Sequence, residues 1–442
     1  MYKRQVWNHP LVQESQELDT SIRSRVACFS PDGRFVVAGK SDGSWADFRL
    51  ELDQFNVFDP QTGQPIGPAI KPNGKTDDIC FDSSSQSVIA VHHDAEGLGF
   101  VSSYNLKTNN QLIETIPLTA SPIWVASHPS KPLVAVMCKD SQLNMIDMEH
   151  GKSLYTKQFN SANDWYCKIR FTPDGKKIVV CSHEYFQALD AISGVACFNR
   201  VKYSNANREN CVMAISPDSE TIAVSSSNSA MFWSLATAEE IGTPLAHTQT
   251  SHYLGAVVGM EFSPDSKHLI TACFDHYARL WDWRTGKQVC PPMQHSGPVH
   301  CAVFTPDGNY AVTGSQGKEC GPHLWELKTG MRVAPSWKAA SGEEDCFVHS
   351  VSVSQDGRNL FATVHMTGDR KPLYRYEFGN LRTQSHFSIQ QLKQIGELTS
   401  SKRFTLGRSE NLPQATWLKL WEQFSKRNPQ FSCEVEDERK LR

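Results

Sequence analysis

The side chains that come closest to a metal-binding pattern stand in two short clusters, His92-His93-Asp94 and His183-Glu184. Imidazole and carboxylate groups are the ligands that zinc and similar ions take in proteins. Both clusters follow apolar runs that we predict to be strands, VIAV and IVVC, and therefore fall where a polar turn is expected. We interpret them as turn residues, and we predict no metal ion and no cofactor.

The sequence lacks the motifs of nucleotide-binding P-loop enzymes, HExxH zinc enzymes and protein kinases. It has neither a GxxxxGK[ST] loop for nucleotide phosphates nor an HExxH zinc motif. It also lacks the glycine-rich loop, the His-Arg-Asp motif and the Asp-Phe-Gly motif of protein kinases. We therefore predict that the chain is not an enzyme.

The 13 cysteines are scattered, and most stand in apolar runs that we predict to be strands, as Cys167 and Cys273 do. No CxxC pair occurs, and the N-terminal residues lack the apolar stretch of a secretory signal. Disulfides are rare in the reducing cytosol. We expect a cytoplasmic protein with reduced, buried thiols. A zinc site built from cysteine and histidine residues far apart in the sequence is a minor alternative.

Charge and hydropathy exclude two classes of partner. The 442 residues carry a formal net charge of −3, which provides no general basic field for nucleic acid or an anionic membrane surface. No apolar run approaches the length that crosses a bilayer. We expect a monomer that binds neither nucleic acid nor membrane.

A phrase of five residues, FSPDG, recurs along the chain. FSPDG at 29–33 returns as FTPDG at 171–175 and 304–308, as FSPDS at 262–266 and as ISPDS at 215–219. Proline sets φ near −65°, aspartate hydrogen-bonds to its own backbone, and glycine accepts positive φ. Each copy therefore predicts the turn of a β-hairpin.

Three degenerate copies complete a regular series. The anchors of the series are Phe29, Phe81, Ala126, Phe171, Ile215, Phe262, Phe304 and Val353. A second mark with a large central residue follows each anchor by 18 to 29 residues. These central residues are Phe58, Tyr104, Ile146, Leu189, Trp233, Trp281, Trp325 and Tyr376. The anchors are 42 to 52 residues apart, which is typical of a propeller blade of four short strands.

The two alternating marks resemble the WD-repeat β-propellers, and LWDWRTG carries the Trp-Asp pair of that family, Trp281 and Asp282. The resemblance implies an all-β fold, a propeller of four-stranded antiparallel blades with a short C-terminal helical tail. Eight anchors favour eight blades, and seven result if a degenerate unit does not form a full blade. We assign residues 1–385 to the propeller and residues 386–442 to the tail.

In this family a His, a Ser or Thr, an Asp and a Trp can form a buried hydrogen-bonded network within one blade. We expect only one unit of this chain to build such a network. Its members are His247 or His252, Thr271, Asp275 and Trp281. A fully satisfied network would rigidify that blade. The Gly-His dipeptide of the family is absent, but Ala246-His247 and Gln294-His295 stand near its place.

Both ends of the repeat region carry further expectations. Trp7 precedes the first anchor by 22 residues, so we expect Leu11–Leu18 to be the outer strand of the blade that contains Val353. That closure would leave no open sheet edge between the first and last blades. Alternatively, the chain is the end of a longer protein and an upstream blade is missing. In the first unit, Ser41–Asn56 predicts a long loop between the second and third strands.

After Phe387 the pattern changes from strands to helices. FSIQQLKQIGEL predicts a short helix, and LPQATWLKLWEQFSKRNP predicts a second one with Trp417 and Trp421 on its apolar face. We expect this helix to dock on the propeller, and a partner's groove is the alternative. The tail resembles the C-terminal extension of bacterial proteins that join a serine/threonine kinase to a WD-repeat propeller, although the kinase is absent here.

The resemblance implies a non-catalytic scaffold for protein–protein interactions in signalling or complex assembly, with a protein or peptide partner. In the family, inner strands start at the narrower face, so residues four to nine before each anchor should ring that face. The candidate partner-binding residues are Arg25, Trp165, Tyr253, His300 and Phe347. Trp, Tyr and Arg are frequent interface anchors. Alternatively, the aromatic side chains plug the central channel, or the protein is a lactonase- or hydrolase-like propeller enzyme with its site at that channel.

Overall fold

The computed structural model describes the strands and most of their connections. The described residues are 12–17, 27–41, 52–106, 108, 110–159, 167–203, 212–226, 228–247, 255–317, 321–333, 346–366, 373–378, 402–405 and 408–411. The chain divides into two compact units, residues 15–376 and residues 1–14 with 377–442. Among the described residues, no helix is long and apolar enough to cross a membrane.

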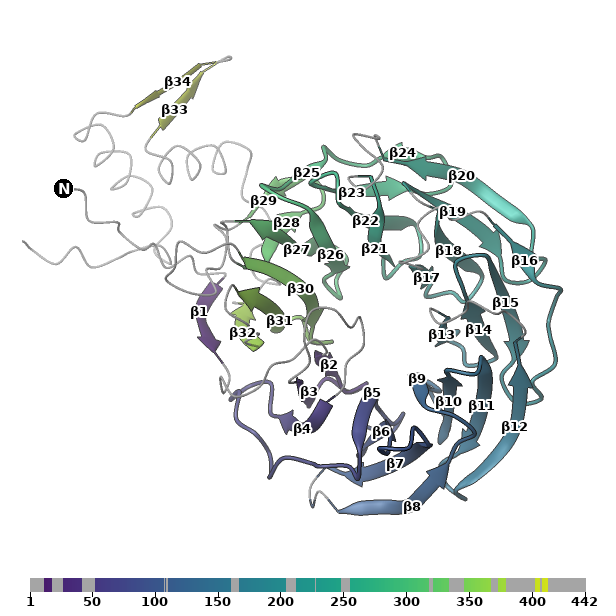
Figure 1. Ribbon diagram of the computed structural model, residues 1–442. Helices are drawn as coiled ribbons and strands as arrows, with labels where there is room; N and C mark the ends of the chain where they lie inside the picture. The colour runs from purple at the N-terminus through teal and green to yellow at the C-terminus, as the bar shows by residue number, and fades with distance from the viewer. Residues whose placement is uncertain are drawn as a thin grey trace, which may run out of the picture. The chain divides into compact units, whose positions relative to one another are not determined.

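Residues 15–376 form antiparallel sheets arranged in a ring (Figure 1). The innermost strands are β2 (Ala27–Phe29), β5 (Lys75–Phe81), β9 (Pro122–Ser127), β13 (Lys168–Phe171), β17 (Met213–Ile215), β21 (Val257–Phe262), β26 (Val299–Phe304) and β30 (Cys346–Val353). We number the blades 1 to 8 in this order. Every anchor predicted from the sequence is the last or the next-to-last residue of an inner strand, so the eight-blade reading holds among the described residues.

Each inner strand pairs with a second strand, which pairs with a third. The second strands are β3 (Val36–Ser41), β6 (Ser87–His93), β10 (Leu133–Cys138), β14 (Lys177–Cys181), β18 (Thr221–Ser226), β22 (His268–Cys273), β27 (Tyr310–Gly317) and β31 (Asn359–Met366). The third strands are β4 (Leu52–Phe58), β7 (Gly99–Asn105), β11 (Gln142–Asp147), β15 (Tyr185–Asp190), β19 (Ser229–Ser234), β23 (Tyr277–Asp282), β28 (His323–Glu326) and β32 (Leu373–Phe378). Every predicted second mark lies in a third strand.

The outer strands vary most in length. They are β8 (Gln111–Pro117), β12 (Lys152–Gln158), β16 (Val201–Lys202), β20 (Glu240–Ala246), β24 (Lys287–Gln288) with β25 (Met293–Gln294), and β29 (Met331–Arg332). In blade 1, single bridges from Pro65 and Ile70 to the third strand take this place. In blade 8, β1 (Val12–Glu17) pairs with β32, which confirms the predicted outer strand of the blade that contains Val353.

The hairpin turns also connect neighbouring blades. Glycines of the PDG turns have positive φ, as Gly175 does at 71°, and serines replace them in the PDS turns, with Ser219 at 64°. Ser219 uses its hydroxyl to accept the backbone N–H of Asp174 from the preceding blade, at 3.0 Å. Ser266 accepts that of Asp218 at 3.1 Å in the same way. The cost of positive φ at these serines is therefore offset by a side-chain hydrogen bond that glycine could not make.

Several expectations need correction or remain outside the described residues. His92 and His93 belong to the end of β6 rather than to a turn, and β4 already begins at Leu52, inside the predicted long loop. The tail contains a hairpin that the sequence did not suggest, formed by β33 (Lys402–Thr405) and β34 (Arg408–Asn411). Both predicted tail helices lie outside the described residues.

One cysteine contradicts the expectation of reduced thiols throughout. Cys346, the first residue of β30, is disulfide-bonded. The other described cysteines are free: Cys28, Cys80, Cys138, Cys167, Cys181, Cys197, Cys273, Cys290 and Cys301. Composition and a missing signal sequence bear on the cellular compartment of a chain. They do not show whether two particular sulfur atoms lie within bonding distance.

We expect Gly194→Ala to destabilise the propeller more than Gly308→Ala. Both glycines have nearly equal positive φ, 68° and 69°, so both substitutions carry the same backbone strain. A Cβ atom at Gly194 would also lie 2.7 Å from the Tyr155 ring of the preceding blade, whereas at Gly308 the nearest atom is 3.6 Å away. Urea unfolding should show an additional loss of about 1–3 kcal/mol for Gly194→Ala, as overpacking gives. Equal losses would contradict this account of blade contact.

Candidate interaction site

Four aromatic rings from three blades meet where β26 and β30 begin. His300 lies between Phe274, which follows β22, and Phe347 of β30, with ring centroids 5.1 Å apart in both pairs. The ring of His349 continues the row, 6.1 Å from that of Phe347. His349 is exposed and the other three are half-buried. We call Phe274, His300, Phe347 and His349 the ring cluster.

The ring cluster carries little charge at its centre. Burial lowers the pKa of His300 to about 4, so its imidazole is neutral near pH 7. Its Nε2 atom is buried without a hydrogen-bond partner among the described residues. The centre of the cluster therefore offers aromatic surface rather than an ion.

Pairing between two blades holds Phe347 in this position. The second strand of blade 7 continues beyond its own sheet and pairs with the inner strand of blade 8, Gln316 with Phe347 and Gly317 with Cys346. The loop before β26 also lies close to β27, and glycine permits this contact because a Cβ atom at Gly297 would collide with the carbonyl oxygen of Gln316. The close contact of β27 with the loop before β26 thus positions both His300 and Phe347.

The structure brings together only part of the residue set predicted from the sequence. His300 and Phe347 stack on each other, whereas Arg25, Trp165 and Tyr253 lie outside the described residues. Phe274 was missed because it follows a second strand rather than preceding an anchor. Its alignment with His300 depends on how blades 6 and 7 sit side by side, which periodicity does not reveal.

A second candidate site is a network of buried hydrogen bonds in blade 6. The Nε2 atom of His247 lies 2.8 Å from Thr271 Oγ1, and its Nδ1 atom lies 3.2 Å from Asp275 Oδ2. Trp281 donates its Nε1–H to the same threonine oxygen at 2.9 Å. The network expected from the family resemblance is therefore present, with His247 in place; the alternative, His252, lies outside the described residues.

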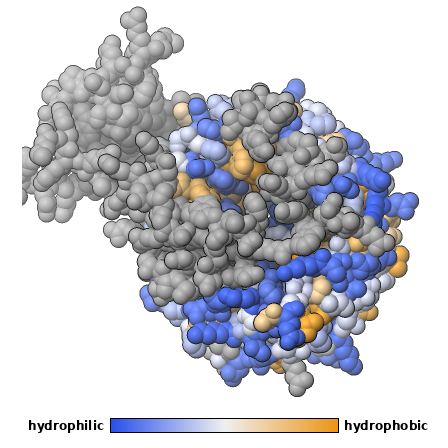
Figure 2. Space-filling model, in the orientation of Figure 1, coloured by the Kyte–Doolittle hydropathy of each residue, from blue (hydrophilic) through white to orange (hydrophobic). Residues whose placement is uncertain are grey.

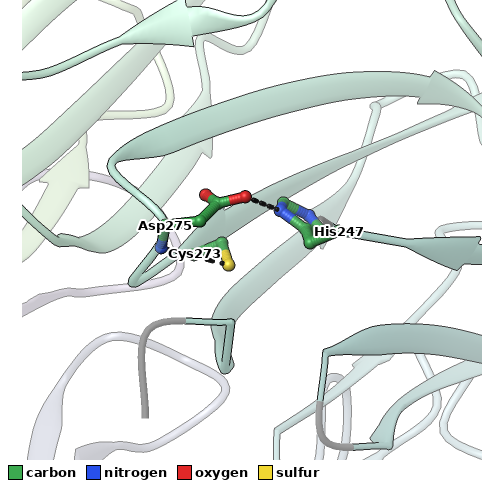
Figure 3. A group of neighbouring side chains, drawn as sticks. All are labelled: His247, Cys273 and Asp275. Atoms are coloured by element: carbon green, nitrogen blue, oxygen red, sulfur yellow. Dashed lines mark hydrogen bonds and ion pairs between the residues drawn. The ribbon is translucent and has the colours of Figure 1, made fainter. Parts of the chain in front are cut away.

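The same network contains the only group of three potential metal ligands among the described residues, His247, Cys273 and Asp275 (Figure 3). The guanidinium of Arg279 donates to Asp275 at 2.6 Å and also contacts the ring of His247. Burial and the positive charge of Arg279 lower the pKa of His247, while burial raises that of Cys273 to about 12. A protonated thiol beside a fixed cation is a poor metal site, so we interpret the group as structural.

Blade 7 contains a second network that the sequence analysis did not expect. Thr313 contacts His295 Nε2 at 3.0 Å and accepts the indole N–H of Trp325 at 2.7 Å. Ser315 takes the place of the aspartate and lies 3.1 Å from His295 Nδ1. The sequence signal for this network was His295, which stands near the place of the Gly-His dipeptide of the family. Without an aspartate partner, the unit did not match the complete pattern.

Two inner-strand carboxyls have pKa values far above the usual range. Burial raises the pKa of Asp78 and that of Glu261 to about 7. Asp78 accepts the backbone N–H of Val125 in the next blade at 2.9 Å, and Glu261 accepts that of Phe304 at 2.7 Å. Both carboxyls therefore connect neighbouring blades. They belong to blades 2 and 6 and do not form a carboxylate pair of the kind that an enzyme uses.

One enzyme-like sequence pattern also lacks its structural context. The letters GKSDG at 39–43 match the GxSxG pattern of hydrolase nucleophiles, which needs a strand followed by a helix. Ser41 instead ends β3 and pairs with Leu52 of the antiparallel strand β4. The pattern therefore gives no support to a hydrolase.

We expect Trp281→Ala to cost about 3–5 kcal/mol, the usual loss for a buried aromatic side chain. Trp281 is 5% exposed and packs between blades 5 and 6. Trp281→Phe keeps most of the apolar contact and removes the N–H that Thr271 accepts, so it should cost about 1 kcal/mol. Chemical denaturation of both variants measures the difference. A loss below about 1 kcal/mol for the alanine variant would contradict the packing role.

We also expect Glu261→Gln to change how stability depends on pH. The folded-state pKa of Glu261 lies above its unfolded value, so the folded state holds the proton more tightly. Its contribution is fully present below about pH 4.5 and is lost as the pH rises through about 7. Melting curves between pH 5 and 8 should therefore lose part of their alkaline decline in Glu261→Gln. Exposed Glu220 provides the control, and an unchanged pH profile in Glu261→Gln would refute the expectation.

Comparison with known proteins finds WD40 repeats in parts of this chain. The WD40 model, described as WD domain, G-beta repeat, matches residues 18–45, 243–282 and 286–320. The second match contains the whole network from His247 to Trp281. The chain also resembles the crystal structure of the computationally designed Ika8 protein, with a TM-score of 0.60 and 14% identity over 82% of this chain and 98% of that one.

Curated relatives carry the same kind of repeat. An uncharacterized WD repeat-containing protein of Schizosaccharomyces pombe is 41% identical over 14% of this chain and 16% of its own length. A guanine nucleotide-binding protein subunit beta of Arabidopsis thaliana is 24% identical over 45% of this chain and 54% of its own. The chain thus spans about half or less of these relatives. Together with the ring of blades, the matches show that the chain contains WD40 repeats and has a β-propeller fold.

Proposed function

We propose that this protein is a non-catalytic scaffold that binds a protein or peptide partner at the ring cluster. WD-repeat proteins are typically interaction scaffolds, and a rigid ring of blades binds a partner without a large ordering cost. We favour this function over a propeller enzyme because the group of three potential metal ligands found among the described residues, His247, Cys273 and Asp275, belongs to a buried structural network.

The observation that carries the proposal is the partly exposed row of rings from blades 6, 7 and 8. Aromatic side chains are enriched at protein interfaces and supply most of the binding energy where they cluster. In Figure 2 the described surface of this face is mostly hydrophilic, and apolar surface gathers over the part of the ring where Figure 1 places β26 and β30. The ring cluster lies at the beginnings of these two strands.

Other inner-strand starts are less suited to recognition. Asp77 at the start of β5 is buried and bound to His93 at 2.6 Å. The exposed apolar residues Leu112 and Leu154 lie on outer strands of single blades, away from any aromatic row. Such isolated apolar residues are normal on protein surfaces. The ring cluster therefore remains the best candidate on the described surface.

The experiment compares His300→Ala and Phe347→Ala, alone and together, with Leu112→Ala as the matched control. Leu112 is 53% exposed on β8, so its truncation removes a similar apolar group elsewhere. Partners found by proximity labelling in the native host are then measured by direct titration. Each ring truncation should weaken binding about 10-fold, the value of about 1.4 kcal/mol expected for an interface anchor.

Two outcomes would overturn this proposal. One is a double variant that folds as the wild type does and binds every partner with wild-type affinity. The other is an equal loss in Leu112→Ala, which would place binding elsewhere. Circular dichroism and melting temperature establish folding for each variant, so a loss of affinity is not confused with a loss of structure.

A further inference from the structure

A cleft opens where blade 8 meets blade 1, lined by the turns that follow β2, β4 and β30. Its lining residues are Asp32–Phe35, Asp59–Gln61, Ile66, Asp356 and Asn359, and we call it the turn cleft. The ring cluster lies at the opposite end of β30, so the two sites belong to opposite faces of the ring. The turn cleft has a volume of about 370 Å³, near the lower end of ligand sites, which suits one side chain with its backbone.

A buried amide in the turn cleft has a hydrogen-bond donor without an acceptor. Asn359 is 4% exposed, and its Oδ1 atom accepts N–H groups from Nε and Nη2 of Arg375, at 3.3 and 3.1 Å. Arginine only donates, so its position fixes the amide oxygen on that side and the nitrogen on the other. The Nδ2 atom donates to no described residue. Because a buried donor without an acceptor is costly, Nδ2 marks a place for a ligand oxygen.

Two carboxylates of the turn cleft carry negative charge without a partner. In Asp59 and Asp356, Oδ1 accepts two hydrogen bonds within its own turn, whereas Oδ2 accepts none from a described residue. Asp32, by contrast, is paired with Arg34 at 2.6 Å. The lining residues thus include three carboxylates and one guanidinium. Arg375 reduces this excess of negative charge without cancelling it, so the turn cleft attracts a cation.

Apolar surface lies in the same cleft as these carboxylates. Phe35 is half-buried, and Ile66 is 37% exposed. Basic side chains lay their aliphatic stems along apolar surface and keep the charged head group with polar partners. The turn cleft therefore matches three parts of one basic residue: its stem, its head group and its backbone carbonyl.

We propose that the turn cleft binds a lysine or arginine residue of a protein partner. The charged head group pairs with Asp59 and Asp356, and the stem packs on Phe35 and Ile66. The backbone carbonyl accepts a hydrogen bond from Nδ2 of Asn359. This second site does not depend on binding at the ring cluster, and its place on the opposite face allows one propeller to hold two partners at once.

The first test measures the affinity of small probes for the full chain by saturation-transfer NMR. Acetyl-arginine methylamide should bind, and acetyl-citrulline methylamide, which has a similar shape without the charge, should bind about 5-fold more weakly. Butylguanidine keeps the cation and the stem but has no carbonyl for Asn359, so it should bind about 3-fold more weakly than acetyl-arginine methylamide. No saturable binding of the arginine probe, or equal affinity for the citrulline probe, would overturn the proposal. Equal affinity for butylguanidine would refute the contact with Asn359.

The second test removes charge from the protein. Asp59→Asn and Asp356→Asn keep an Oδ1 atom for the turn, so each should weaken binding of acetyl-arginine methylamide about 3-fold, and the double variant about 10-fold. Asp218→Asn is the matched control, because Asp218 Oδ1 accepts the Ser216 hydroxyl and the backbone N–H of Glu220 in the corresponding turn of blade 5. This control should bind the probe with wild-type affinity.

Two results of the second test would contradict the site. One is a double variant that has the melting temperature of the wild type and also its affinity for the probe. The other is an equal loss of affinity in Asp218→Asn, which would show that the probe responds to the overall charge of the protein rather than to the turn cleft.

Discussion

Every blade buries both faces of its sheet against its two neighbours, and the rest of the structure depends on this packing. A four-stranded sheet alone would leave one apolar face in water. The core consequently consists of clusters that each span two blades, as the one that joins Phe232 of blade 5 to Trp281 and Trp283 does. Such a core forms only when the blades follow one another around the ring, because each supplies half of a neighbour's interior.

Smaller polar contacts then fix the angle between successive blades. Serine hydroxyls in the turns and the carboxyls of Asp78 and Glu261 all accept backbone N–H groups from an adjacent blade. These hydrogen bonds satisfy polar groups that apolar packing would otherwise leave buried without a partner. The carboxyls have raised pKa values because the same packing removes water from them. The connection between blades is therefore sensitive to pH in a way that the apolar core is not.

The rigid ring explains how distant parts of the sequence reach one surface. Phe274 and Phe347 are far apart in the chain, yet each lies about 5 Å from the ring of His300. No loop has to close for this arrangement, since the three residues belong to three successive blades. The pairing of β27 with β30 is an addition to the regular plan, and it carries both the exposed rings and the disulfide of Cys346. Blades 1 and 2 are also joined by strand pairing, through Leu52 of β4 and Thr76 of β5.

The sequence by itself determined the repeating architecture. The anchors and second marks are local turn and strand signals, and each depends on residues within a few positions, as in the φ of Gly175 or Ser219. The network around Trp281 was also predictable, because one unit matched the family pattern. Only the tertiary structure decided which residues from different blades touch. The cluster around His300, the second network at Thr313 and the bond of Cys346 depend on register between strands and on the spacing of neighbouring blades. Those distances arise from packing across the ring, and hydrophobic periodicity along one chain segment contains no information about them.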